Sequence, residues 1–501
     1  IWILRHAAGA IDSDEAAAGL MARAFARGSF STFFWGQQYG GTLEPMLVGA
    51  FFRVAGSSRI ALKSIPIGLS GMSAVLVWRI GRRAINEHAG RIAGALCWIW
   101  PTAYVWWSTK ERGFYWVALT LGLGVVLLAL RLDEHPRRHR DWALLGLAIG
   151  LGWWTSPQIA LFAIPAGGWL AWRLRRDLWP GVAVAAGTAL VGSLPWWRAN
   201  LLSDWASLDT ASQSDHRGFL AHLWSVVHHG LPTALGLRHV YTERWILGPV
   251  GPALFVALLA LAAAGGIRTW RASDCGRVIV IATLGTLILL AFAPNTEYVG
   301  EGRYELFVWP FLALLLAAAA TGIHTPRFRA PRFTVSALLG PALVATGAVL
   351  TITTLAPLNE ATLPHAPDVH VPADMKPLVH ALEAHRLTTV YADYWLAYRV
   401  TFESSERIIA TPFASVRWRP YDDTVRQSAC PVYAFVTSSG SLEVFGKQLA
   451  AIGVTAQRLR AGLFTVVIPD RAVTPQEAST GAQSSATRTG RNVPSCHRAK
   501  V

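Results

Sequence analysis

The sequence predicts a polytopic α-helical membrane protein with a small α/β domain outside the membrane, on three observations. Hydrophobic residues make up 52 % of the 501 residues and charged residues only 15 %, whereas a soluble globular chain carries about 25 % charge. Long apolar runs bounded by charged residues fill the chain as far as residue 356. After residue 357 short strand-like and helix-like segments alternate.

Ten apolar runs have the length and the charged borders of membrane-spanning helices. Two of them are short and are separated by Pro157. The chain opens on Ile-Trp-Ile-Leu without a Met, which indicates one further helix cut short at the N-terminus, so we predict about 11 spans. The ten runs lie at 61–79, 91–107, 114–131, 142–156, 159–173, 181–197, 248–267, 277–293, 305–321 and 334–356.

The basic residues predict the orientation in the membrane. The chain has a formal charge of +15, and Arg clusters fall on every second connection between the runs, as in 131–140 and 327–332. The positive-inside rule places these connections in the cytoplasm. Residues 5–60, the loop 198–247 and everything after 357 then lie on the outer face. This distribution accounts for the positive charge without a nucleic-acid partner, and the bilayer is the partner we expect.

The chain divides into three predicted regions. Residues 1–356 form the membrane domain, with an outer loop at 5–60, and 357–473 form the extracytoplasmic α/β domain. Residues 474–501, rich in Ser, Thr, Gly and Ala, are predicted to be a disordered tail. Within the α/β domain we expect strands at 388–392, 432–436 and 463–468 and helices at 375–385 and 442–452.

Carboxylates gather at the start of the outer loop. Asp12, Asp14 and Glu15 precede an apolar periodic stretch, which predicts a helix with acidic residues in its first turn. A helix cap by itself explains such residues. Their place directly after a spanning helix favours a functional role, because unpaired carboxylates at membrane depth are costly. Glu44 follows in the same loop, amid aromatic and glycine residues that suit a sugar.

Cationic residues also stand at outer helix ends. Lys110 and Arg112 follow the second outer turn, and Arg303 with Tyr304 opens a later helix. An interfacial charge belt is the ordinary explanation, because Lys and Arg flank most spans. The positive-inside rule disfavours them on the outer side, which favours a role in binding an anion. The four cysteines are widely spaced and form no metal-binding pattern.

The stretches SDEAAAGLMARAF (13–25) and WGQQYGGTLEP (35–45) resemble the GT-C membrane glycosyltransferases. Within these, the chain is most similar to the protein O-mannosyltransferase-like family 39 and to the lipid A aminoarabinose transferases. The resemblance covers roughly residues 1–356. A weaker one, in YADYWLAYRVTFESSERIIA (391–410), is to the outer domain of actinobacterial relatives. Many relatives have Lys- or His-Pro-Pro where this chain has Leu43-Glu44-Pro45-Met46.

The resemblance implies a cell-envelope glycosyltransferase that moves a monosaccharide from a polyprenyl-phosphate donor to a glycan, lipid or protein acceptor at the outer face. Asp14 matches the Asp of the family's Asp-Glu pair and is the expected general base. Asp12 is the competitor, because Asp12-Ser13-Asp14 also spells DxD. Glu15 and Glu44 are expected to orient the acceptor or a divalent cation, whose involvement the sequence leaves open.

The donor phosphate needs fixed cations, and Lys110, Arg112, Arg303 and Tyr304 are the expected ligands, Arg303 and Tyr304 because they resemble an Arg-Tyr pair of relatives. A multipass transporter or lipid flippase is the alternative function, and a noncatalytic scaffold a third. A transporter should carry ionisable residues inside its spans. These spans are nearly free of charge and the acids crowd one outer loop, which favours the enzyme.

Overall fold

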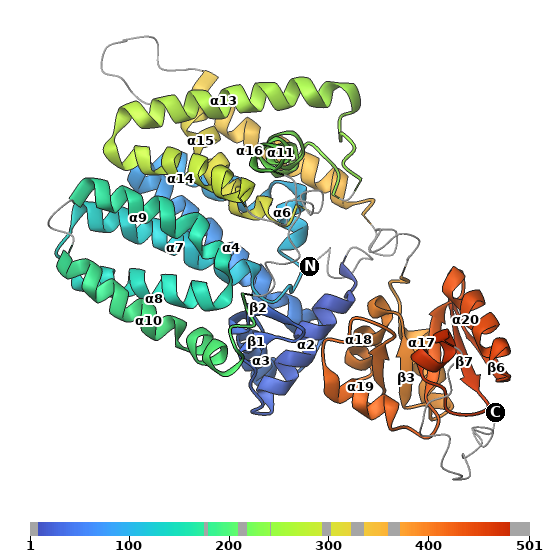
Figure 1. Cartoon of the computed structure of the whole chain (residues 1–501). Helices are drawn as coiled ribbons and strands as arrows, with labels where there is room; N and C mark the ends of the chain where they lie inside the picture. The colour runs from blue at the N-terminus through green and yellow to red at the C-terminus, as the bar shows by residue number, and fades with distance from the viewer. Residues whose placement is uncertain are drawn as a thin grey trace.

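The computed structural model describes residues 9–174, 179–208, 218–240, 242–292, 302–321, 335–358 and 371–480. Helices make up most of the chain before residue 358, and a five-stranded sheet with flanking helices follows residue 371 (Figure 1). The prediction of a helical membrane protein with a small α/β domain is therefore confirmed. The opening residues 1–8, where a first helix was expected, lie outside the described ranges.

Each predicted apolar run is helical over most of its described residues. Five helices of the described ranges are long and apolar enough to cross a membrane by themselves, among them α4 and α7. The total of about 11 spans stays a prediction. The helices of this region are α4 (Arg59–Ala84), α5 (Glu87–Ile99), α6 (Thr102–Trp107), α7 (Tyr115–Glu134), α8 (His139–Thr155), α9 (Ala160–Leu174), α10 (Trp179–Leu202), α11 (Phe219–Ser225), α12 (Leu231–Ala234), α13 (Gly251–Ala272), α14 (Asp274–Ala291), α15 (Trp309–Thr321) and α16 (Val335–Leu355).

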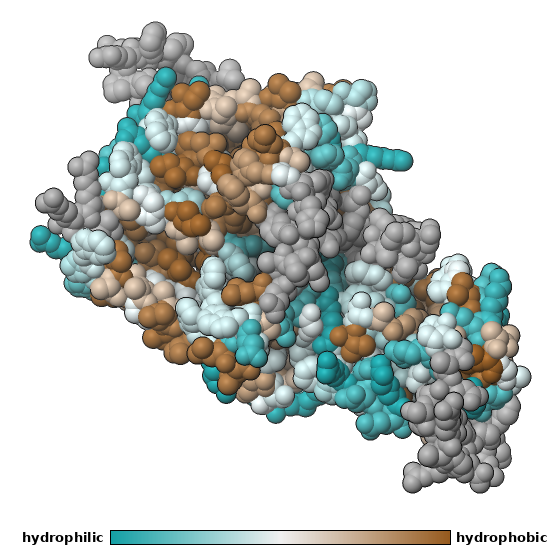
Figure 2. All heavy atoms as spheres, viewed as in Figure 1, coloured by the Kyte–Doolittle hydropathy of each residue, from teal (hydrophilic) through white to brown (hydrophobic). Residues whose placement is uncertain are grey.

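The sides of these helices that point away from the core of the bundle are apolar. Figure 2 shows hydrophobic residues spread over the helical part, whereas the C-terminal domain presents mainly hydrophilic ones. Met72, Leu190 and Val256 are 54 %, 57 % and 65 % exposed. A soluble protein rarely leaves so much contiguous apolar surface to water. The helical part therefore has the surface of a membrane domain.

Two predicted runs differ from continuous spans. The run 91–107 is broken, because α5 ends at Ile99 and α6 begins at Thr102. Pro101 lacks the backbone N–H that a continuous helix needs and disfavours helical backbone at Trp100, which is extended. In the run 305–321, the regular helix α15 begins only at Trp309. Every residue of α15 except its last is buried, so it is a core helix of the bundle.

The C-terminal domain contains one mixed sheet. Its strands β3 (Thr389–Ala392), β4 (Ile409–Pro412), β5 (Val432–Val436), β6 (Ala456–Ala461) and β7 (Phe464–Pro469) lie in the order β4-β3-β5-β7-β6. β3 is parallel to β4 and to β5, and β7 is antiparallel to β5 and β6. The three predicted strands and the two predicted helices, α17 (Lys376–Ala384) and α20 (Gly440–Ala451), are confirmed.

The sequence did not predict β4, β6, α18 (Tyr394–Glu403) or α19 (Arg419–Arg426). The predicted start of a disordered tail at 474 is wrong for its first residues, since Pro475–Thr480 forms helix α21. Glu477 and Ala478 are buried there, and Arg471 holds Glu477 at 2.7 Å. The remainder of that tail, 481–501, lies outside the described residues.

The outer loop is a folded unit that joins the two parts. It comprises α2 (Ser13–Ala26), the hairpin β1 (Phe33–Phe34) with β2 (Gln37–Gly41), and α3 (Leu43–Ala55), and Figure 1 shows α2 and α3 between the membrane helices and the C-terminal domain. Helix α18 packs on α2. A Cβ at Gly19 would lie 2.5 Å from the Phe402 ring, so a side chain there would separate the helices. Trp35 stacks on Trp418 with ring centroids 4.1 Å apart.

Candidate active site

The acidic cluster begins helix α2. Asp12 is the N-cap: its backbone is extended and its side chain accepts a hydrogen bond from the Glu15 N–H at 3.0 Å. The Glu15 carboxylate accepts in return from the Asp12 N–H, which completes a capping box. Asp14 occupies the first turn of the helix. The helix start thus directs Asp12 and Glu15 inward and leaves Asp14 for another set of partners.

Asp14 lies at the contact between the outer loop and the C-terminal domain. Its carboxylate accepts hydrogen bonds from Arg112, from Arg417 at 2.6 Å and from the Tyr394 hydroxyl. Its side chain is 20 % exposed, whereas that of Asp12 is 2 % exposed. Asp14 is therefore the carboxylate of the cluster that a small molecule can reach.

The charges around Asp14 keep it ionised. Burial acts to raise the pKa of Asp14, but the guanidinium groups of Arg417 and Arg112 act in the opposite direction. A hydrogen bond from Tyr394 adds to their effect, and the pKa of Asp14 lies below its ordinary value. Asp14 is thus held in its ionised form, which is the form that a general base requires.

Asp12 and Glu15 are fully engaged in a buried ion-pair network. Glu15 is paired with Lys63 and, at 3.1 Å, with Lys110, and it accepts the Glu111 N–H at 3.2 Å. Lys110 also contacts Asp12 at 3.4 Å, and Arg112 reaches Asp12 at 2.8 Å. The side chains of Lys63, Lys110 and Glu15 are completely buried. Such compensation is what allows these charges to be buried at all.

A small cavity opens beside Asp14. Its lining combines one carboxylate with three guanidinium groups, because Arg112, Arg303 and Arg417 all contribute to its wall. Arg303 lies 5.7 Å from the Trp107 ring centroid and 5.8 Å from that of Tyr115, so aromatic faces hold its guanidinium group. The remaining lining residues are Phe34, Gln37, Tyr39, Phe114 and Tyr115.

The structure places some expected site residues away from this cavity. Lys110 lies behind it, buried against Asp12 and Glu15 and over the Trp106 ring at 5.1 Å. Tyr304 lines a separate apolar pocket with Leu231 and Val308. The two residues were expected to bind the donor phosphate beside Arg112 and Arg303, and the geometry brings only the two arginines to the cavity.

Glu44 was expected to orient an acceptor or a metal ion, but it forms a buried pair with Glu111. Both residues have no exposed surface, and one oxygen of each carboxyl group, Oε1 of Glu44 and Oε2 of Glu111, has no hydrogen-bond partner among the residues that the structure describes. Glu44 also accepts the Val117 N–H at 3.2 Å. Burial raises the pKa of Glu44 to about 7, and burial together with Glu44 raises that of Glu111. Burial thus favours the protonated form of both carboxyl groups, because the charged form of a buried carboxylate loses its hydration.

Four residues of this arrangement were not predicted from the sequence. Lys63 and Glu111 belong to helix and turn segments that looked ordinary, and Tyr394 and Arg417 come from the C-terminal domain. Arg417 is positioned by its neighbours, because its N–H donates to the Tyr398 hydroxyl at 2.7 Å and its Cα lies 3.0 Å from where a Cβ of Gly36 would be. Tyr394 lies in the stretch 391–410, whose weak resemblance was the only signal.

Among the residues that the structure describes, no group of three or more His, Cys, Asp or Glu side chains is placed to hold a metal ion. Glu44 and Glu111 bring two carboxyl groups together, and Glu15 is neutralised by two lysines. We therefore assign no residue to a divalent cation.

Comparisons with known proteins agree with this architecture. Residues 43–197 match the family described as dolichyl-phosphate-mannose-protein mannosyltransferase. A curated relative, undecaprenyl phosphate-alpha-4-amino-4-deoxy-L-arabinose arabinosyl transferase 2 of Pseudomonas fluorescens (strain Pf0-1), is 32 % identical over 139 residues. That match covers 25 % of this chain and 24 % of the relative, so the chain spans about a quarter of that protein's length.

Solved structures extend the likeness over more than nine tenths of the chain. ArnT from Cupriavidus metallidurans in the apo state has a TM-score of 0.61 at 13 % identity and covers 91 % of this chain and 93 % of its own. ArnT bound to undecaprenyl phosphate has a TM-score of 0.57 at 14 % identity, with the same coverage. The Archaeoglobus fulgidus oligosaccharyltransferase in complex with Zn and sulfate has a TM-score of 0.54 at 11 % identity and covers 93 % of this chain and 72 % of its own. At these identities the likeness establishes the fold, and the chain has the fold of the GT-C membrane glycosyltransferases.

Proposed function

We propose that this protein transfers a monosaccharide from a polyprenyl-phosphate donor to a hydroxyl group of a glycan, lipid or protein acceptor at the outer face of the membrane. The observation that carries the proposal is the cavity in which the ionised Asp14 stands beside Arg112, Arg303 and Arg417. The family match over residues 43–197 and the fold shared with ArnT, one structure of which is bound to undecaprenyl phosphate, support the donor class.

The charge balance of the cavity suits a lipid-phosphate leaving group. Three guanidinium groups face one carboxylate, so the lining carries an excess of two positive charges. A polyprenyl-phosphate sugar is a phosphodiester with one negative charge, and its departing polyprenyl phosphate carries two. Cations fixed before the reaction stabilise charge that grows in the transition state. Arg can hold such a phosphate through two parallel hydrogen bonds.

Asp14 is the proposed general base. The acceptor oxygen attacks the anomeric carbon, the bond from that carbon to the phosphate oxygen breaks, and the phosphate leaves with the electron pair. The acceptor proton passes to the Asp14 carboxylate, whose place at the cavity wall supports this role. Asp12 is a poorer candidate because its side chain is only 2 % exposed, against 20 % for Asp14, and lies inside the buried ion-pair network.

The proposed outer location of the site rests on charge distribution. The cavity lies at the end of α4 that begins with Arg59, whereas the basic cluster at Arg79–Arg83 lies at the opposite end. By the positive-inside rule the basic end is cytoplasmic. The C-terminal domain, which supplies Arg417 and Tyr394 to the site, is then extracytoplasmic.

The test is a turnover assay with purified protein in detergent–lipid micelles and a panel of polyprenyl-phosphate sugars. One donor should be consumed, with release of polyprenyl phosphate. Asp14→Asn keeps the shape of the side chain and removes the base, so turnover should fall about 100-fold or more while donor binding persists. Asp12→Asn is the matched control and should cost less. Full turnover by Asp14→Asn, or no consumption of any donor, would contradict the proposal.

A further inference from the structure

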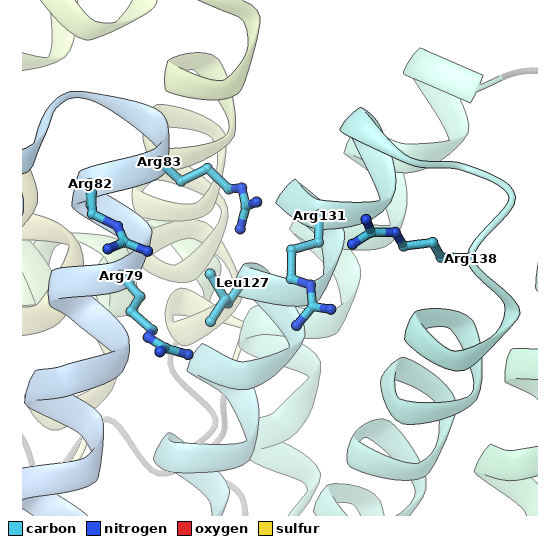
Figure 3. A pocket seen from close by; sticks show the side chains of 6 residues that line it. All are labelled: Arg79, Arg82, Arg83, Leu127, Arg131 and Arg138. Carbon is cyan, nitrogen blue, oxygen red and sulfur yellow. The ribbon is translucent and has the colours of Figure 1, made fainter.

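A second charged cavity lies at the far end of the membrane domain. Five arginines line it: Arg79, Arg82 and Arg83 from α4, Arg131 from α7, and Arg138 from the turn before α8. Figure 3 shows the three arginines of α4 on one side and Arg131 and Arg138 on the other, with Leu127 between them. The cavity has a volume of about 330 Å³. This space is large enough for a phosphate group and its substituents.

Helix α4 fixes the distance between this cavity and the candidate active site. Lys63, in the ion-pair network of the active site, and Arg82 are 19 residues apart on the same helix. At about 1.5 Å per residue their separation along the axis is about 28 Å. The hydrocarbon core of a bilayer is about 30 Å thick. The arginine cavity therefore lies at the membrane surface opposite to Asp14.

Carboxylates neutralise only part of the positive charge. Glu134 accepts two hydrogen bonds from Arg83, at 2.7 and 3.0 Å, and Asp141 pairs with Arg131 at 2.8 Å. Arg82 has a long contact of 3.8 Å with Glu87. Among the described residues, no carboxylate forms an ion pair with the two remaining arginines, Arg79 and Arg138. The cavity thus keeps an excess of about two positive charges that face an open space.

An apolar path leads from the cavity along the lipid-facing side of α4. Val75 and Met72 precede Arg79 by four and seven residues, which places the three side chains on one face of the helix. Val75 is 49 % exposed and Met72 is 54 % exposed. Leu127 of α7 is buried and forms the apolar wall of the cavity. A molecule with an anionic head and an apolar tail would match both parts of this surface.

We propose that this cavity binds the phosphate headgroup of an anionic phospholipid from the leaflet opposite to the active site. The guanidinium groups of Arg79 and Arg138 hold the phosphate oxygens, and the acyl chain lies over Val75 and Met72. Basic pockets between membrane helices on the cytoplasmic side are a general type of anionic-lipid site. A free phosphate ion would use the arginines but would gain nothing from the apolar path.

The test uses the full-length protein purified in a neutral detergent and measures the rise in Tm as phosphatidylglycerol is titrated into the micelles. Phosphatidylcholine is the reference lipid. R79Q/R138Q should weaken phosphatidylglycerol binding by about 10-fold or more, because it removes the two arginines without carboxylate partners. R137Q/R140Q removes the same net charge next to Arg138, from the turn before α8 and the first turn of α8, but no residue of the cavity. Its binding should change by less than about 2-fold.

Three results would overturn the proposal. Equal weakening in both double variants would mean that net charge, and not the cavity, attracts the lipid. Equal protection by inorganic phosphate, with no further gain from phosphatidylglycerol, would assign the cavity to free phosphate. R79K/R138K keeps both charges and should retain most of the shift. If R79Q/R138Q keeps the full shift with phosphatidylglycerol, the two arginines are not what binds the lipid.

Discussion

The two ends of helix α4 both carry clustered charges, but the charges are buried at one end and exposed at the other. At one end Lys63 is completely buried and paired with Glu15, within a network that also contains Lys110 and Asp12. At the other end Arg82 and Arg83 are 51 % and 32 % exposed. Burial makes each charge of the first end dependent on its partner, whereas water and lipid headgroups solvate the second. The first end is built for fixed geometry and the second for exchange with a ligand.

The largest expected effect is on the stability of the buried end. Lys63→Met leaves the Glu15 carboxylate with one fewer buried partner and should cost about 3–5 kcal/mol of unfolding free energy. The measurement is an unfolding titration in detergent micelles. A loss below about 1 kcal/mol would show that Glu15 can be neutralised or solvated without Lys63, and the end of α4 would then resemble its opposite end.

The Glu44–Glu111 pair should make the stability depend on pH. The folded-state pKa of Glu44 is about 7, above the ordinary value of 4.5. The unfolded chain releases the proton first as pH rises, so this group lowers stability progressively from about pH 4.5 to about pH 7, by about 3 kcal/mol in total. Glu44→Gln keeps the shape and removes the ionisation. It should be more stable than the wild type at pH 8 and nearly equal to it at pH 4.5.

Thermal unfolding at several pH values measures this difference. Glu383→Gln is the control, because this carboxylate lies at the surface of the C-terminal domain, where it pairs with Arg407, so the variant should not gain stability over the wild type as the pH rises. A constant difference between Glu44→Gln and the wild type across the pH range would mean that the pKa of Glu44 is not raised in the folded protein.

Arg417 connects the C-terminal domain to the chemistry of the site. Arg417→Ala removes a hydrogen bond between charged groups and a phosphate ligand, so kcat/KM should fall by about 10- to 100-fold. Because Arg417 lowers the pKa of Asp14, the acid limb of the pH–rate profile should also move to higher pH. Arg417→Lys should restore part of this limb. Arg419→Ala, two residues on at the start of α19, is the control, and an identical profile for both alanine variants would separate Arg417 from the site.

The smallest effect is expected at the exposed end. Arg83→Met breaks the two hydrogen bonds to Glu134, at 2.7 and 3.0 Å, yet should cost less than about 1 kcal/mol in lipid-free micelles. Arg83→Met and Lys63→Met both replace a cationic residue of α4 by Met. The two unfolding titrations therefore compare an exposed charge with a buried one. If both variants lost equal stability, burial would not be what distinguishes the two ends.

Much of the fold could be predicted from local pattern alone. The membrane helices can be recognised from long apolar runs with charged residues at their borders. The reason is that the hydrocarbon core of the bilayer excludes polar side chains over the whole length of a spanning helix. Short apolar segments that alternate with helix-like ones likewise predicted β3, β5 and β7. Prediction failed for elements whose own residues show no clear apolar pattern. Strand β4 is short, and most residues of β6 are exposed, so neither forms a long apolar pattern. The break between α5 and α6 depends on the single residue Pro101.

The sequence by itself determined that acidic residues stand at the start of α2 and that cations lie on the same side of the membrane, because residue type and membrane topology are read locally. Only the tertiary structure decided which partners meet. Arg417 reaches Asp14 across 403 residues of chain, and Lys110, equally cationic, is instead enclosed with Glu15. Whether a charge becomes a buried structural partner or faces a cavity depends on the packing of distant segments, since solvation is set by everything that surrounds the group.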